Sequence, residues 1–120
     1  MGYKKINYKG YKNCYFEVGN YLYNSQSMSI QIKNDEEGIL YTATVNMPDY
    51  LYYPGTATIK NYSENSGMTK FLKKLGIIEE VYSSKRAHQY ADEKETIDYC
   101  QIDEEKLKEY SKTFNYEWKI

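Results

Sequence analysis

Apolar and polar residues alternate in several short stretches of the chain, which is typical of half-buried β-strands. The clearest stretch is 28–33, where Met28, Ile30 and Ile32 fall on one side and the residues between them are polar. The β-branched and aromatic segment 39–46 predicts a second strand, joined to the first by a polar loop that ends in a glycine. The two segments are therefore predicted to form a β-hairpin.

Further strands are expected on both sides of this hairpin. The segments that predict them are 3–8, 14–18, 56–60 and 96–102, and a turn is expected over 9–13. Pro48 and Pro54 exclude a central strand between them, because proline lacks the N–H that a sheet requires. Residues 79–82 fit either a strand or extended chain, and the polar segment 83–95 is expected to be an exposed excursion.

The apolar spacing changes to that of a helix after Asn61. Met68, Phe71, Leu72 and Leu75 recur at intervals of three and four, which places them on one face of a short α-helix. Ser63 or Asn65 is expected to cap its beginning, and Gly76 suits the left-handed position that ends a helix.

A second helix is expected near the end of the chain. Asp103 is its predicted N-cap, and Leu107, Tyr110 and Phe114 mark its buried side. The alternating tail 116–120 could add a strand. Together these elements predict one α+β domain over residues 1–120, a curved antiparallel sheet of five or six strands with two short helices.

Composition and charge narrow the classes of function. The 120 residues carry a net charge of −1, which argues against an acidic DNA mimic and against a strongly basic duplex binder. No apolar run is long enough for a membrane span, and the first residues lack a secretory signal, so a cytoplasmic protein with no membrane partner is expected. Cys14 and Cys100 are predicted to be buried, reduced thiols; a disulfide between them is possible, but a cytosol would keep it reduced.

The residues typical of catalysis and cofactor binding are sparse. His88 is the sole histidine, and neither cysteine stands in a metal-binding pair. The glycines form no phosphate-binding loop. We therefore expect no catalytic residues, no metal, no cofactor and no enzymatic activity.

Tyrosine is the residue that departs most from ordinary usage. The chain has 16 tyrosines, where about four are expected from average composition. AT-rich codons and strand propensity account for part of this excess, and the alternative is that some rings are exposed for contact with a partner. The segments best suited to such contact predict a partner-binding set of Tyr50, Tyr52, Tyr53, Arg86 and Tyr90.

The N-terminal segment suggests a different partner. It interleaves lysines with stackable rings and has no acidic residue, as in proteins that hold single-stranded nucleic acid. The candidate residues are Lys4, Lys5, Tyr8, Lys9, Tyr11 and Lys12. The ordinary interpretation is an edge hairpin whose lysines discourage pairing with other chains.

Two blocks of sequence carry a resemblance to a known family. They are Thr44-Val45-Asn46-Met47-Pro48 and the longer stretch from Ile59 to Met68, followed by Leu75-Gly76-Ile77-Ile78. Over residues 28–102 the chain resembles a family of small proteins encoded on mobile elements and prophages of low-GC Gram-positive bacteria. The family has no catalytic residues to carry over.

The resemblance implies a mobile-element context, in which small non-enzymatic proteins often inhibit host defence. We therefore expect a non-catalytic protein-binding module, and the narrower expectation is an anti-CRISPR-like inhibitor that occludes a surface of a host defence nuclease. The partner would be a host protein, such as an effector that handles nucleic acid. The alternative is a single-stranded nucleic-acid-binding domain that uses the N-terminal hairpin.

Overall fold

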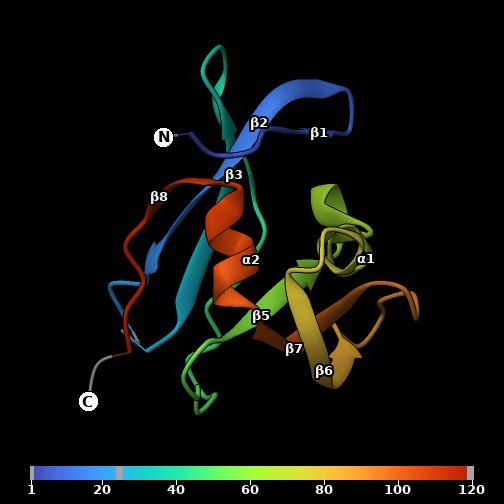
Figure 1. The fold of residues 1–120 in the computed structure, drawn as a ribbon. Helices are drawn as coiled ribbons and strands as arrows, with labels where there is room; N and C mark the ends of the chain where they lie inside the picture. The colour runs from blue at the N-terminus through green and yellow to red at the C-terminus, as the bar shows by residue number, and fades with distance from the viewer. Residues whose placement is uncertain (1, 24–25, 119–120) are drawn as a thin grey trace.

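The computed structural model describes residues 2–23 and 26–118, and within these ranges it has eight strands in two sheets with short helices between them (Figure 1). The first sheet contains β1 (Ile6–Tyr8), β2 (Tyr11–Asn20), β3 (Met28–Asn34), β4 (Gly38–Thr42) and β8 (Ser111–Phe114). The second contains β5 (Thr56–Asn61), β6 (Ile78–Arg86) and β7 (Thr96–Ile102). The helices are the 3₁₀ turn η1 (Ser63–Asn65), α1 (Met68–Lys74) and α2 (Glu104–Glu109).

The first sheet runs in the order β1-β2-β3-β4, and β8 pairs with β2 in parallel. The predicted hairpin of β3 and β4 is confirmed, with Asn34 paired to Gly38 at its turn. On β2, Val18 lies opposite Ile30 of β3 on one side and Phe114 of β8 on the other. The middle of β2 is therefore an interior strand that joins residues from the two ends of the chain.

The expectation of one sheet with five or six strands is wrong, because the predicted strand 39–46 divides between two partners. β4 ends at Thr42, and Ala43 donates its N–H to Ile30 O of the first sheet at 2.8 Å. Val45 then donates to Thr58 O of β5 at 3.0 Å, and Thr44 forms an isolated bridge with Ile59. The chain thus crosses from one sheet to the other within three residues, and β5-β7-β6 forms a separate sheet.

One hydrophobic core serves both sheets and both α-helices. Its fully buried side chains include Phe16, Met28, Ile30, Ile32, Ile59, Met68, Leu72, Ile77 and Leu107. Because the two sheets share this core, the described residues form a single α+β domain, as predicted.

Helix α1 has the predicted apolar stripe, since Met68 and Leu72 are fully buried. Neither Ser63 nor Asn65 caps it; the side chain of Asn61 does so instead, accepting the N–H of Thr69 at 2.7 Å. The sequence did not predict this because Asn61 belongs to β5, and only the tertiary fold brings it to the helix.

Helix α2 begins as predicted and ends earlier. Asp103 accepts the N–H of Lys106 at 3.0 Å, and Leu107 is buried. The helix stops at Glu109, so Phe114 lies in β8 and not on the helix. The added strand is therefore at 111–114; the described part of the tail, through 118, forms no strand, and Ile120 lies outside the described residues.

The remaining differences concern the ends of strands. The first turn is shorter than predicted, with positive φ at Lys9 and Gly10, and β2 continues from Tyr11 through Asn20. β6 extends to Arg86, so the exposed excursion is only 87–95. Across the described ranges we find no helix with the length and apolar character needed to span a bilayer.

Candidate functional site

The loop 47–55 packs its aromatic residues against the outer face of the second sheet. Tyr99 of β7 pairs with Thr58 of β5 and directs its ring to this face, where it meets Tyr50 with ring centroids 5.8 Å apart. The ring of Tyr82, from β6, lies 5.9 Å from that of Tyr99. We call the resulting patch the tyrosine surface, and its members are Tyr50, Leu51, Tyr53, Tyr82 and Tyr99.

Hydrogen bonds hold the loop against β7. The hydroxyl of Tyr99 donates to Leu51 O at 3.1 Å and accepts the N–H of Tyr53 at 3.2 Å. The amide of Gln101 donates to Pro54 O at 3.3 Å, and its carbonyl oxygen accepts the hydroxyl of Tyr82 at 2.9 Å. The loop is therefore fixed in place before any partner arrives.

Gly55 ends the loop in a conformation that favours glycine. Its φ is +72°, and a Cβ at this position would lie 2.8 Å from Glu104 Oε2 and 2.9 Å from Gln101 Nε2. Its N–H donates to the hydroxyl of Tyr116 at 3.0 Å. The close approach of α2 and the C-terminal segment thus fixes the direction in which the loop enters β5.

The prediction that Tyr52 contacts a partner is wrong, because its side chain is buried and only 5% exposed. Its hydroxyl accepts the N–H of Met47 at 3.0 Å and bonds to Thr58 Oγ1 at 2.8 Å. Its ring packs 5.9 Å from Tyr99. Tyr52 therefore supports the loop from beneath and is not an available contact.

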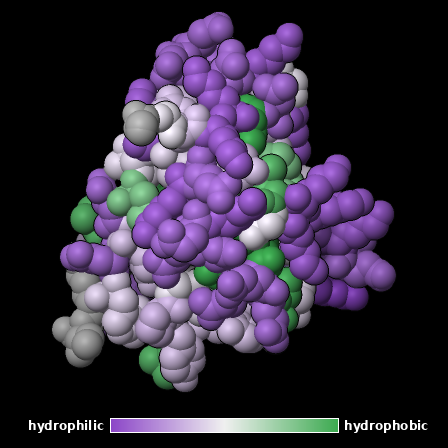
Figure 2. All heavy atoms as spheres, in the orientation of Figure 1, coloured by the Kyte–Doolittle hydropathy of each residue, from purple (hydrophilic) through white to green (hydrophobic). Residues whose placement is uncertain are grey.

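The residues on either side of Tyr52 point outward. Leu51 is 81% exposed and Tyr53 is 63% exposed. The ammonium of Lys85 lies 5.3 Å from the ring centroid of Tyr50, which adds a cation beside the rings. In Figure 2 most of the visible surface is hydrophilic, and one small hydrophobic group lies at the lower edge, where the loop 47–55 is seen in Figure 1.

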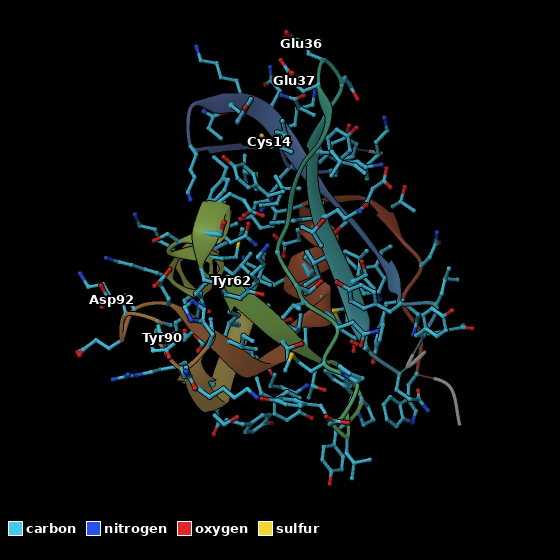
Figure 3. The ribbon with its side chains drawn as sticks, turned by 180° about the vertical axis from the view of Figure 1, so that it is seen from behind. Cys14, Glu36, Glu37, Tyr62, Tyr90 and Asp92 are labelled. Carbon is cyan, nitrogen blue, oxygen red and sulfur yellow. The ribbon has the colours of Figure 1, made fainter. Side chains whose placement is uncertain are left out.

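Arg86 and Tyr90 lie at the other end of the second sheet. Arg86 ends β6, and Tyr90 follows in the 87–95 connection, where Figure 3 shows it close to Asp92. Both are exposed, and Tyr90 is 84% exposed. Lys85, the neighbour of Arg86, lies beside the ring of Tyr50, but within the described residues no hydrogen bond or ring contact joins Arg86 or Tyr90 to the tyrosine surface.

Sequence reasoning missed Tyr82 and Tyr99. The signal for Tyr99 was the alternation in β7, in which Cys100 and Ile102 are buried and Tyr99 and Gln101 point outward. Tyr82 gave no comparable signal, because β6 has two register irregularities that break its alternation. Leu22 and Tyr23, at 97% and 86% exposed, were also missed; they follow β2 in a loop bonded to Asn46.

The N-terminal candidates for nucleic-acid binding are partly used by the fold. Lys4 Nζ pairs with Glu109 at 2.9 Å, and Lys9 Nζ donates to Glu64 O at 2.8 Å.

The prediction that Tyr8 stacks on a nucleic-acid base is wrong, because Tyr8 is only 6% exposed. Its ring packs inside the protein, with its centroid 4.4 Å from that of Phe71. Lys5, Lys12 and Tyr11 remain exposed, although Tyr11 is only 37% exposed and its ring lies against Tyr41. The hairpin therefore offers one partly exposed ring, where stacking on successive bases needs several.

The cysteines are free and buried, as predicted. Burial, with the nearby charge of Asp98, raises the pKa of Cys100 to about 12, which is the opposite of what an attacking thiolate needs. His88 is exposed in the 87–95 connection. Within residues 2–23 and 26–118 no three His, Cys, Asp or Glu side chains are placed to hold a metal ion.

Comparison of the chain with protein-family models, with curated proteins and with solved structures finds no match. The resemblance to mobile-element proteins consequently stays a prediction.

Proposed function

We propose that the protein is a non-catalytic binding module that docks on another protein through the tyrosine surface. The observation that carries the proposal is the fixed loop 47–55, which presents Leu51 and Tyr53 to solvent from a backbone held by Tyr99, Gln101 and Tyr116. Tyrosine and exposed aliphatic side chains on a preorganised backbone bind partners with little entropy cost.

The tyrosine surface has the composition of a binding centre. Its rings provide apolar area with polar hydroxyls, and the residues that contribute most to protein interfaces are enriched in tyrosine, tryptophan and arginine. Charged side chains such as Lys85 lie at its margin, where they favour orientation more than affinity. When a partner binds this patch, the part of its surface that is in contact is covered and is no longer accessible to other molecules. The proposed mechanism is therefore occlusion.

The resemblance to mobile-element proteins supports a narrower form of the proposal. In that form the partner is a host defence nuclease, and the protein inhibits it by covering a working surface. A cytoplasmic location follows from such a partner.

The test is affinity capture of partners from a lysate of a bacterium that carries defence nucleases, followed by titration of the purified partner. We expect the double variant Leu51→Ala/Tyr53→Ala to weaken binding by at least about 2 kcal/mol, since residues central to an interface cost this much when truncated. The matched control is Tyr11→Ala/Ile39→Ala, which removes one exposed tyrosine and one exposed aliphatic residue from the first sheet.

Equal affinity of the Leu51/Tyr53 variant and the unchanged protein would contradict the proposal. Loss of binding in the Tyr11/Ile39 control alone would favour the N-terminal hairpin. In that case single-stranded oligonucleotide binding should also be detected, and it should weaken steeply as salt rises from low to physiological concentration.

A further inference from the structure

A polar hollow lies on the side of the second sheet that carries α1, away from the tyrosine surface. It is bounded by α1, by β6 and β7, and by the connection 87–95, and its volume is about 610 Å³. In Figure 2 the right-hand side of the molecule, where Figure 1 places α1 and this connection, is strongly hydrophilic. The volume lies in the range of sites for small ligands.

The floor of the polar hollow is a fixed network of hydrogen bonds. Asp98 of β7 is 7% exposed, and its carboxylate accepts hydrogen bonds from Asn61 Nδ2 at 3.0 Å, from Thr69 Oγ1 at 2.8 Å and from Ser84 Oγ. These partners come from β5, α1 and β6. Because protein donors already satisfy most of its oxygen lone pairs, Asp98 does not need the nearby lysines.

Three lysines line the polar hollow above this floor. Lys70 and Lys73 stand three residues apart on one side of α1, and Lys94 reaches in from the connection 87–95. All three are exposed, and among the ion pairs of the described residues none involves them. With Glu93 and Asp98 the lining has a net charge of +1, and three ammonium groups remain without a fixed anion.

Two hydroxyl groups add hydrogen-bond donors to the same lining. Ser66 is exposed two residues before α1, and its hydroxyl makes no hydrogen bond to the described residues. Thr96 Oγ1 accepts from Asn61 Nδ2 at 3.3 Å, which leaves its proton free to donate. The polar hollow thus combines unpaired positive charge with hydroxyl donors in a space of limited size.

We propose that the polar hollow binds a small phosphate-bearing ligand of mononucleotide size. Several ammonium groups around one space suit a compact anion with many acceptor oxygens, since lysine binds phosphate as a point charge. Arginine, whose paired N–H groups bind both carboxylate and phosphate, is absent from this lining, so its cations act as point charges. Here side chains would bind the phosphate, whereas in nucleoside triphosphatases the backbone N–H groups of a glycine-rich loop do so.

The probe is ADP, with adenosine and inorganic phosphate as comparisons, measured by calorimetric titration of the full chain at low ionic strength. ADP is expected to bind at millimolar or lower concentration, inorganic phosphate more weakly, and adenosine without detectable heat. Raising the salt concentration should weaken ADP binding, because exposed charges are screened.

The decisive variants compare lysines that line the polar hollow with a lysine of α1 that does not. Lys70→Gln/Lys73→Gln/Lys94→Gln should lower ADP affinity at least about tenfold, as expected when charge-assisted hydrogen bonds are lost. Lys74→Gln removes an exposed lysine of α1 that does not line the polar hollow, and should leave affinity unchanged. All variants are expected to keep the fold because these side chains are exposed, and unfolding curves check this.

The proposal is overturned if ADP does not bind, if adenosine binds as well as ADP, or if the triple variant and Lys74→Gln behave alike. It is independent of the tyrosine surface, so Leu51→Ala/Tyr53→Ala should bind ADP as tightly as the unchanged protein.

Discussion

Asp98 is a buried carboxylate whose contacts join three elements of the fold. Its bonds to Asn61, Thr69 and Ser84 connect β7 to β5, α1 and β6. Asn61 also accepts the N–H of Thr69, so the same group of side chains begins α1 and fixes it over the sheet. At this site, hydrogen bonds between polar side chains therefore hold β5, β6, β7 and α1 together.

The first prediction concerns this network. Asp98→Ala should lower the free energy of unfolding by about 2–4 kcal/mol, because the buried amide of Asn61 and the partly buried hydroxyl groups of Thr69 and Ser84 lose their common acceptor. Ser84→Ala removes only one bond and should cost about 1 kcal/mol. Urea denaturation of both variants measures the difference, and equal costs would contradict the role assigned to the carboxylate.

The second prediction concerns the pKa of Glu64. A hydrogen bond from Lys60, at 2.9 Å, is the main cause that lowers this pKa from 4.5 to about 2. A lowered pKa in the folded state stabilises the protein above pH 4.5, and this contribution is lost as the pH falls from 4.5 toward 2. Because Glu64 is half exposed, solvent screening limits the contribution to less than about 1 kcal/mol.

Urea midpoints measured from pH 7 to pH 2 test this expectation. The difference between the unchanged protein and Glu64→Gln should shrink across that interval. Lys60→Gln, which removes the main cause of the lowered pKa of Glu64, is the comparison and should reduce this change.

At the scale of elements, the pattern of the chain predicted those whose contacts are local. Three features are found in the structure as predicted: the apolar stripe of α1, the Asp103 cap of α2 and the alternation of β3. Each of them depends only on residues that are a few positions apart in the sequence. The cap that Asn61 provides for α1 and the division of the segment 39–46 depend on residues far apart in sequence, so no local pattern could reveal them.

The third prediction concerns the beginning of α2. Asp103→Ala should cost about 1 kcal/mol of stability, since its carboxylate satisfies the N–H of Lys106 at the first turn. Asp103→Ser keeps an acceptor at the same position and should retain most of this stability. Thermal unfolding compares the two, and an equal loss in both would contradict the capping role.

At the scale of the whole molecule, the candidate site depends on distant contacts. The position of the aromatic run between two prolines was enough to predict that part of it is exposed, and Leu51 and Tyr53 are. The burial of Tyr52 could not be predicted in this way, because it depends on the hydrogen bond to Thr58 of β5. The contribution of Tyr99 required the pairing of β7 with β5. The tyrosine surface thus exists only once the second sheet has formed.

We expect the C-terminal segment to control the loop that carries the tyrosine surface. Tyr116→Phe removes the acceptor of the Gly55 N–H, which is buried, and should cost about 1–3 kcal/mol. The amide of Gly55 should then exchange with solvent faster relative to amides of β3, as measured by hydrogen exchange. Unchanged exchange at Gly55 would show that the loop is held without Tyr116.

The parallel pairing of β8 with β2 has a consequence for synthesis. A ribosome makes β2 well before β8, because β3 to β7 and both α-helices lie between these two strands in the chain. During that interval Phe16 and Val18 belong to a strand with one unsatisfied edge, which is a template for pairing with other nascent chains. This edge of β2 is therefore covered only after β8 has been made.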